Sequence, residues 1–324
     1  MYADYYHLKT MPFQLTPDCQ FLFESAEHKR AISHLIYGLT QGEGFIVITG
    51  EIGAGKTMLV ERLWSEIDQR KFVAVRILTT QISGDDILKM VASGFRLSTE
   101  GADKATLLRR LEHFFAEMQA AGKQCLLIVD EAQNLPASAL EELRMLSNFA
   151  VGGRAPFQCF LLGQPQFRQM LSDPGLEQLQ QRVLASYHLG PMIQLETREY
   201  VEHRMKTAGW SGDPSFEDAA FGAIHRHSSG IPRRINSLCS RVLLAGYLDE
   251  AHCISELIVN SVAEELSRDL VAGRSQSESR SAANAISGQS SDRKIASLER
   301  VVNRHDRIIK RALMIAVELV ETLK

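Results

Sequence analysis

The chain has 324 residues, of which 45% are hydrophobic, and a formal net charge of −3 at pH 7. Its length favours two or more domains with an ordinary core, and its charge gives no reason to expect a nucleic-acid-binding protein. No apolar run approaches the ~18 residues of a membrane span, and the first residues lack the pattern of a signal peptide. The five cysteines have no C-x-x-C spacing, so we expect reduced cysteines in a cytoplasmic protein.

Residues 1–24 are rich in aromatic side chains and contain two prolines. We interpret them as an N-terminal strap that either packs across the core or covers a bound base. Ser25 has the side chain of a helix N-cap, and apolar residues follow it at helical spacing over 26–39.

A glycine-rich loop follows an apolar run rich in β-branched residues, Phe45–Ile48, which predicts a buried strand. The loop sequence GEIGAGKT, residues 50–57, matches the phosphate-loop pattern G-x-x-x-x-G-K-[ST] at every fixed position. Glycines let backbone N–H groups point at phosphate oxygens, and the next helix adds its positive N-terminal end. Lys56 can reach the phosphates and Thr57 can bind Mg²⁺. The predicted nucleotide-binding residues of the loop are Gly50, Glu51, Ile52, Gly53, Ala54, Gly55, Lys56, Thr57 and Met58.

Strand-like and helix-like segments then alternate along the chain. The strands are expected over 72–78, 124–131 and 157–163, and the helices over 85–95, 104–121 and 136–150. This alternation predicts a parallel sheet covered on both faces. From Glu196 onward we expect helices only, over 196–208, 215–227, 232–248 and 255–270, which form a small helical lid domain.

Polar residues at strand ends are candidates for the chemistry. Asp130 and Glu131 end the third strand, where Asp130 would hold Mg²⁺ and Glu131 would polarise the attacking water. Gln164 follows the fourth strand and faces the γ-phosphate, and Arg182 and Arg233 can stabilise phosphoryl charge. Each has a plainer interpretation as well: the carboxylates can cap a helix, the glutamine can belong to a turn, and single arginines are more often surface residues.

The end of the chain has a different composition. Residues 271–293 are rich in serine and poor in apolar residues, which predicts a flexible linker. Over 294–324, apolar or small residues recur at alternating spacings of three and four, the pattern of an amphipathic or coiled-coil helix. We expect this tail to self-associate or to dock onto a partner, with peripheral contact to anionic lipid or nucleic acid as the alternative.

Together these motifs resemble an AAA+ ATPase in their order along the chain. Residues 1–270 resemble the ATPase domain of the general-secretion-pathway protein A family (the ExeA type), in stretches that include VDEAQNL, LLGQPQF and GIPRRINSLCSRVLL. Within that group, GEGFIVITGE and EELRMLSNF are similar to the ATPase of exosortase (PEP-CTERM) loci.

The resemblance implies an α/β P-loop NTPase fold (AAA+) with a parallel sheet core, a small α-helical lid domain and a C-terminal helical tail. It implies that ATP and Mg²⁺ are the cofactors, that Thr57 and Asp130 bind the metal, and that Lys56 and Glu131 are catalytic. Gln164 takes the first-sensor position, Arg182 resembles an arginine finger offered to a neighbouring subunit, and Arg233 resembles the second sensor in the lid. We divide the chain into a strap, the nucleotide-binding domain, the lid, the linker and the tail, at 1–24, 25–193, 194–270, 271–293 and 294–324.

The family expectation is a Mg²⁺-dependent ATP hydrolase that assembles into a ring or filament and acts in envelope export or exopolysaccharide production. The secretion protein continues into a membrane span and a peptidoglycan-binding domain, and this chain has neither. We therefore expect a cytoplasmic protein, or one peripheral to the inner membrane. Two alternatives remain open: a nucleotide-gated DNA regulator resembling transposition ATPases, and a scaffold that binds ATP with little turnover.

Overall fold

The structure is a computed structural model that describes residues 2–268, apart from 17, 67, 69, 79–83, 150–154 and 156. One compact unit comprises Met1–Leu266. The linker predicted over 271–293 and the helix predicted over 294–324 lie outside the described residues. Among the helices that are described, none is both long and apolar enough to cross a membrane.

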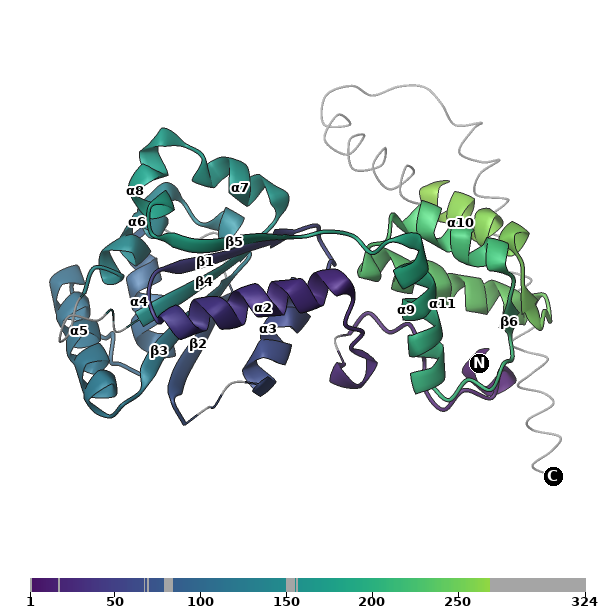
Figure 1. Ribbon diagram of the computed structural model, residues 1–324, viewed down its shortest axis with the longest axis horizontal. Coiled ribbons are helices and arrows are strands. Elements are labelled where there is room, and N and C mark those ends of the chain that lie inside the picture. Colours follow the sequence, from purple (N-terminus) through teal and green to yellow (C-terminus); the bar gives the residue numbers. More distant parts are fainter. Residues whose placement is uncertain are drawn as a thin grey trace, which may run out of the picture. The chain divides into compact units, whose positions relative to one another are not determined.

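A parallel five-stranded sheet forms the centre of the α/β part (Figure 1). Its strands are β1 (Phe45–Gly50), β2 (Phe72–Leu78), β3 (Gln124–Asp130), β4 (Phe157–Gly163) and β5 (Val183–Leu189). The strand order is β2-β3-β4-β1-β5, so β2 and β5 are the two edges. Because all strands run in the same direction, the loops after β1, β3 and β4 emerge together at the carboxyl ends of the strands.

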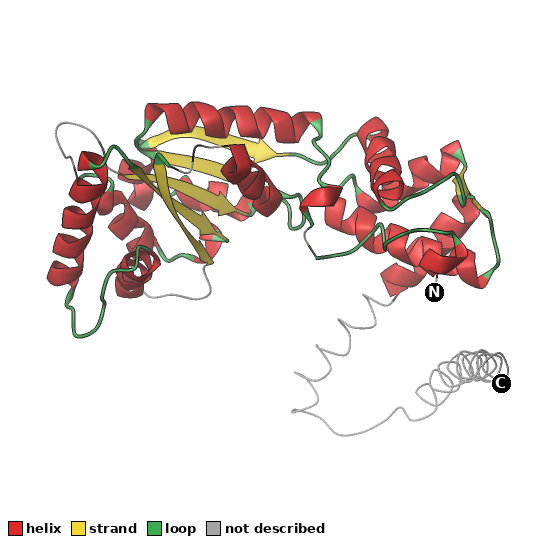
Figure 2. Cartoon of the chain, turned by 90° about the horizontal axis from the view of Figure 1, so that it is seen from below, coloured by secondary structure: helices red, strands yellow, loops and turns green. Residues whose placement is uncertain are grey.

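Helices cover both faces of this sheet (Figure 2). On one face, Phe45 and Val47 pack in a cluster with residues of the helices α4 to α8, which are α4 (Gly84–Gly94), α5 (Lys104–Ala120), α6 (Ala137–Leu146), α7 (Pro165–Leu171) and α8 (Glu177–Gln180). On the other face, Ile46 and Ile48 pack with α2 (Ala26–Gln41) and α3 (Lys56–Glu66). Successive side chains of a strand point to opposite faces, so the apolar run of β1 fills both cores. Full burial of each such side chain is worth about 1.5–3 kcal/mol.

The strands expected over 45–48, 72–78, 124–131 and 157–163 are all present, within a residue or two at their ends. The fifth strand, β5, was not predicted. Helix α6 ends at Leu146, four residues earlier than its predicted end at residue 150. Ser25 caps α2 as predicted, accepting a hydrogen bond from the backbone N–H of His28.

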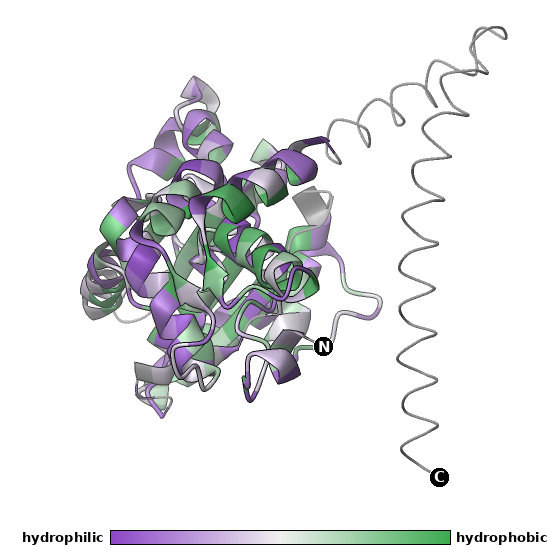
Figure 3. Ribbon diagram, turned by 90° about the vertical axis from the view of Figure 1, so that its right-hand side faces the viewer, coloured by the Kyte–Doolittle hydropathy of each residue, from purple (hydrophilic) through white to green (hydrophobic). Residues whose placement is uncertain are grey.

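The lid consists of α9 (Gln194–Thr207), α10 (Asp218–Ser228), α11 (Pro232–Leu248) and a helix over 256–268. The expectation of helices only was wrong, because β6 (Ser215–Phe216) and β7 (Cys253–Ile254) form a short parallel pair. The helix predicted to begin at 215 therefore begins at 218. Many helices in Figure 3 carry hydrophilic and hydrophobic colours along one ribbon, as amphipathic helices do.

The strap packs against the lid helices. It contains α1 (Tyr2–Tyr5) and a short 3₁₀ turn, Cys19–Phe21; two further 3₁₀ turns, Ala132–Asn134 and Pro174–Leu176, lie in the α/β part. Tyr6 and Phe13 are buried in the same cluster as residues of α9, α10 and α11. The Tyr6 hydroxyl donates to the Ala251 carbonyl at 2.9 Å. The strap thus joins the core of the lid before the chain enters α2.

Candidate functional site

The loop between β1 and α3 has the backbone of a phosphate-binding loop. Gly53 (φ +83°) and Gly55 (φ +100°) both lie in the left-handed region that favours glycine. Lys56 opens α3, and its ammonium donates to the carbonyls of Gly50 at 2.8 Å and Glu51 at 3.0 Å. The side chain therefore curls back over its own loop, at the position where a phosphate would meet it.

Lys56 is only 6% exposed. Burial lowers the pKa of its ammonium, while the carboxylates of Glu131, Asp130 and Glu51 act in the opposite direction. A buried cation is unfavourable without anionic partners. A phosphate group bound in this loop would supply them, so the residues present fit a nucleotide.

Two side chains donate to one oxygen of the Asp130 carboxylate, and the backbone N–H of Glu131 donates to the other at 3.0 Å. Thr57 Oγ1 donates to Asp130 Oδ2 at 3.0 Å, and Arg76 Nη2 donates to the same oxygen at 2.7 Å. Arg76 comes from β2 and also lies 3.7 Å from a carboxylate oxygen of Glu61. The Thr57 hydroxyl keeps its lone pairs free for a cation while its proton points at Asp130, which is the arrangement that a Mg²⁺ ion bound to ATP requires.

Glu131 has an unusual backbone and a well-defined side chain. Its φ of +56° is rare for a residue with a side chain, and such conformations gather at functional sites. Its Oε2 accepts hydrogen bonds from Gln133 Nε2 at 2.6 Å and from Gln164 Nε2 at 3.1 Å. Gln133 Oε1 in turn accepts from the backbone N–H of Gln164 at 2.9 Å. The two glutamines therefore fix one oxygen of the carboxylate.

The lid reaches the phosphate loop through Arg233. Its backbone N–H donates to the Gly53 carbonyl at 3.2 Å. A Cβ added to Gly53 would lie 2.2 Å from the Cβ of Arg233, closer than real atoms approach. Gly53 is thus required by its backbone conformation and by the close approach of the lid.

A cavity of about 390 Å³ opens between the loop, the strap and the lid, a size that suits a small-molecule site. Of the predicted site residues, those that line it are Ile52, Gly53, Gly55, Lys56, Thr57, Met58, Glu131 and Arg233. The strap contributes Gln14, Leu15, Thr16, Asp18, Phe21, Leu22 and Phe23. Gly50, Glu51 and Ala54 belong to the same loop without lining the cavity. Asp130 and Gln164 do not line it either, but they contact Thr57 and Glu131, which do.

One wall of the cavity is a buried polar chain within an aromatic surface. Arg204 of α9 donates to the Pro12 carbonyl at 2.6 Å and to the Tyr200 hydroxyl at 3.1 Å, and its guanidinium lies 4.8 Å from the centre of the Phe21 ring. Tyr200 donates onward to Asn236 Oδ1 at 2.8 Å. These contacts tie the strap to the lid and place the rings of Phe21 and Tyr200 beside the Arg204 guanidinium on the cavity wall.

Arg182 lies apart from these residues. It precedes β5, and its carbonyl accepts from the N–H of Phe45, at the amino end of β1. Its side chain is exposed, and Nη1 donates to the Ser147 carbonyl at 3.2 Å. Arg182 is not one of the described residues that line the cavity.

Sequence reasoning missed several residues of the site. Arg76 had a signal, because it is a lone charge inside the apolar run FVAVRIL, one strand away from Asp130. Gln133 lies two residues after Glu131, and its polar side chain in VDEAQNL was a second signal. His28, which also lines the cavity, gave no signal at all, because its contact with the loop depends on tertiary structure.

Residues 39–171 match the family model described as an AAA domain. General secretion pathway protein A of Aeromonas hydrophila is 37% identical over 269 residues, which is 82% of this chain and 49% of that protein. The chain therefore spans about half the length of this curated relative.

Solved structures share the fold at low identity. The ORC2 protein of Aeropyrum pernix, solved as ADPNP and ADP complexes, superposes with a TM-score of 0.60 at 15% identity, covering 79% of this chain and 72% of that one. Cdc6p of Pyrobaculum aerophilum superposes with a TM-score of 0.58 at 16% sequence identity, covering 74% of this chain and 68% of that one. The fold is an α/β AAA+ P-loop fold with a parallel five-stranded sheet and a helical C-terminal region, as the motifs predicted.

Proposed function

We propose that this chain, with its AAA+ fold, binds ATP with Mg²⁺ and hydrolyses the nucleotide to ADP and phosphate. One observation supports this proposal above the others. Lys56, Thr57, Asp130 and Glu131 meet at the carboxyl ends of β1 and β3, beside a cavity large enough for a nucleotide. This combination of a buried cation, a hydroxyl and two carboxylates is the one that phosphoryl transfer needs.

Lys56 would bind the β- and γ-phosphates, exchanging its two carbonyl acceptors for phosphate oxygens. Thr57 and Asp130 would hold Mg²⁺, which neutralises phosphate charge when it is bound. Among the described residues there is no group of three His, Cys, Asp or Glu side chains that could hold a metal ion by itself. Mg²⁺ usually keeps several waters and binds substrate phosphates, so we expect phosphate oxygens and water as its other ligands.

Glu131 would orient the attacking water or accept its proton. The hydrogen bonds from Gln133 and Gln164 to its Oε2 would hold the carboxylate in place for this task. Gln164 would sense the γ-phosphate from its position after β4, and Arg233 would report it to the lid.

Arg182 would act on the nucleotide of a second copy. An exposed guanidinium remote from its own loop can stabilise phosphoryl charge only in a site to which another chain brings its phosphates. The active form would then be a homo-oligomer, a ring or a filament, with Arg182 at each contact.

ATP binding and phosphate release test the core of the proposal. We expect the wild type to bind ATP with Mg²⁺ and to release phosphate. Lys56→Ala should lose binding, and Glu131→Gln should bind ATP but release phosphate at least about 100-fold more slowly. Calorimetry and a phosphate assay measure both, and retained binding by Lys56→Ala would place the nucleotide elsewhere.

For the biological role, we propose a motor or switch in bacterial envelope secretion. The similarity to general secretion pathway protein A supports secretion, and the exosortase-like stretches support exopolysaccharide export as the finer assignment. The tail would supply a partner contact or a peripheral membrane contact. Replacing the gene by one that encodes Lys56→Ala or Glu131→Gln should abolish export of the exopolysaccharide. Normal export in both strains would refute this role.

A further inference from the structure

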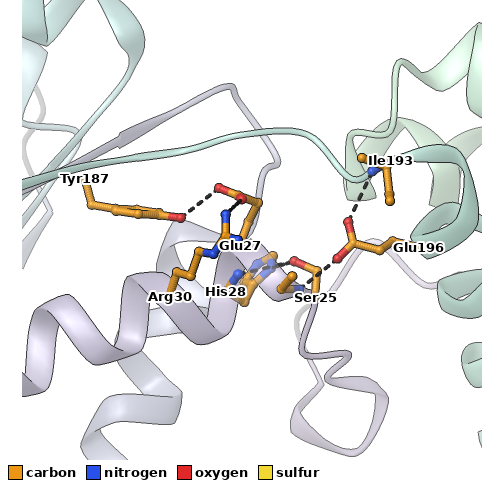
Figure 4. A network of polar contacts seen from close by, with 8 residues as sticks. Ser25, Glu27, His28, Arg30, Tyr187, Ile193 and Glu196 are labelled. Carbon is orange, nitrogen blue, oxygen red and sulfur yellow. Dashed lines mark hydrogen bonds and ion pairs between the residues drawn. The ribbon is translucent and has the colours of Figure 1, made fainter.

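One carboxylate, that of Glu196, touches two helices of different parts of the chain. Its Oε1 accepts the backbone N–H of Ala26, the first residue of α2, at 2.8 Å. Its Oε2 accepts the backbone N–H of Ile193, the N-cap of its own helix α9, at 3.2 Å. Figure 4 shows Glu196 between the start of α9 and the turn that opens α2. A single side chain of the lid therefore caps the N-termini of a lid helix and of a helix that covers the sheet.

The charge of Glu196 suits this position. Both helix ends present unsatisfied N–H groups and a partial positive charge, so one carboxylate gains from both. A bond from a backbone N–H to a carboxylate is also stronger than one between neutral groups.

The first turn of α2 continues this contact to the phosphate loop. Ser25 Oγ lies 2.7 Å from His28 Nδ1, and both residues are buried. The other ring nitrogen of His28, Nε2, lies so close to Gly55 that an added Cβ would be 2.7 Å from it. His28 thus packs directly on the loop, two residues after Ala26, the residue that Glu196 holds.

The contacts of Glu27 hold α2 against the sheet, whereas the backbone N–H of Ala26 at the start of the helix is bonded to the lid. The Tyr187 hydroxyl of β5 donates to Glu27 Oε2 at 2.7 Å, and Arg30 Nη1 lies 3.2 Å from the other oxygen of Glu27. The connection between β5 and α9 is only four residues, 190–193. A change in the direction of α9 would therefore alter the hydrogen bond at Ala26 and, through His28, the packing on Gly55.

We propose that Glu196 is a positioning residue that couples the helical lid to the phosphate loop through the first turn of α2. The inference rests on the proposed nucleotide binding and adds a second path beside Arg233, which reaches the loop at Gly53. Glu196 holds the lid where Arg233 can meet the nucleotide, and the bound phosphates hold the loop and His28 where Ala26 can meet Glu196. Each event therefore favours the other, as coupled binding equilibria require.

Ala26→Pro removes the hydrogen bond from the Ala26 N–H to Glu196 with little other change. Proline is well accepted as the first residue of a helix, and the residue before it, Ser25, already has the extended backbone (φ −65°, ψ 165°) that proline demands. The variant keeps the bond from Ile193 to Glu196, so α9 stays capped. Ala137→Pro is the matched control, because Ala137 is exposed and is the first residue of α6.

The experiment measures lid position and nucleotide affinity in the full chain. One spin label is placed on Cys253, which is exposed in β7, and one on a cysteine introduced at His113 of α5, in a Cys19→Ser background. Binding of a non-hydrolysable ATP analogue is measured by calorimetry, and melting curves report stability.

We expect Ala26→Pro to melt like the wild type, to show a broader distribution of label distances without nucleotide, and to bind the ATP analogue about five- to tenfold more weakly. Glu196→Gln, which keeps one acceptor oxygen, should change in the same direction. Glu202→Gln removes the same charge from an ion-paired surface position of α9 and should change neither quantity.

Two outcomes overturn the proposal: an unchanged distance distribution, or a broader distribution with unchanged affinity, which would leave Glu196 as a cap without coupling. If the wild type fails to bind the analogue, the proposed nucleotide function fails. The label distances without nucleotide would still decide whether Glu196 sets the lid position.

Discussion

The two ends of the central sheet differ sharply. At the carboxyl end, Lys56 and Asp130 are nearly inaccessible: Lys56 donates to two backbone carbonyls, and Asp130 accepts from Thr57, Arg76 and the backbone N–H of Glu131. At the amino end, Arg182 is exposed and donates to a single backbone carbonyl among its described hydrogen bonds. The strand between them, β5, has six residue steps of about 3.3 Å each, so the ends lie roughly 20 Å apart.

This difference teaches where each residue can act. Groups that must meet a phosphate in their own chain are buried and oriented in advance, which strengthens their electrostatic effect. Arg182, at the opposite end, is exposed and lies away from these groups. Under the proposed function, the same chain would hold a nucleotide at one end of its sheet and offer an arginine to a second copy at the other.

The largest expected effect tests this division directly. Arg182→Ala and Glu131→Gln should each lower ATP turnover by about 10³-fold or more, because one lacks the donated arginine and the other lacks the group that activates water. Mixed in equal amounts they should recover a substantial part of wild-type turnover, since an intact Glu131 site then meets an intact Arg182. Phosphate release by the mixture is the measurement.

Arg109→Ala, which removes an exposed arginine of α5, should keep wild-type turnover by itself. A mixture no more active than its components would mean that Arg182 does not complete the site of another copy.

A smaller effect is expected for the glutamine that holds Glu131. Gln133→Ala should lower kcat about tenfold and leave the KM for ATP nearly unchanged, because it frees the carboxylate without touching the phosphates. Gln169→Ala, an exposed glutamine of α7, serves as the control. A rise in KM with unchanged kcat would assign Gln133 to substrate binding instead.

The smallest effect concerns the burial of His28 at the carboxyl end. Burial lowers the pKa of its imidazole below 6.5, against the opposing effects of the Ala54 backbone and of Glu196, Glu24 and Glu27. Below pH 6.5 the unfolded chain takes up this proton first, so the free energy of unfolding falls as the pH drops towards the folded pKa. The slope cannot exceed one proton, about 1.4 kcal/mol per pH unit.

Urea unfolding between pH 7.5 and 5.5 checks this prediction. His28→Gln should lose less stability over that range than the wild type, whereas His113→Gln, at an exposed position of α5, should follow the wild type. Parallel curves for the wild type and His28→Gln would contradict it.

The sequence predicted what depends on local pattern. The apolar runs of β1, β3 and β4 are buried on both faces, which gives an unbroken apolar signal, and the loop glycines have fixed spacing. The edge strand β5, VLASYHL, alternates exposed and half-buried residues and so lacked an apolar run. The strands β6 and β7 have two residues each, too few for any periodicity.

Contacts made by the folded chain escaped prediction. Arg76 meets Asp130 across 54 positions, and Glu196 meets Ala26 across 170. Neither partner can be chosen from spacing, because any of several carboxylates or backbone N–H groups was chemically suitable. The contact of Arg233 with Gly53 could not be predicted either, because the phosphate-loop pattern already accounts for a glycine at this position.

The hydrogen bonds of Lys56 to the carbonyls of Gly50 and Glu51 have a consequence for affinity. A phosphate that entered the loop would displace these two bonds, so part of its binding free energy would offset their loss. Because a bond from an ammonium to a phosphate oxygen is stronger than one to a neutral carbonyl, the exchange would still favour the phosphate. In the absence of a phosphate, the same two carbonyls hold the ammonium inside the loop.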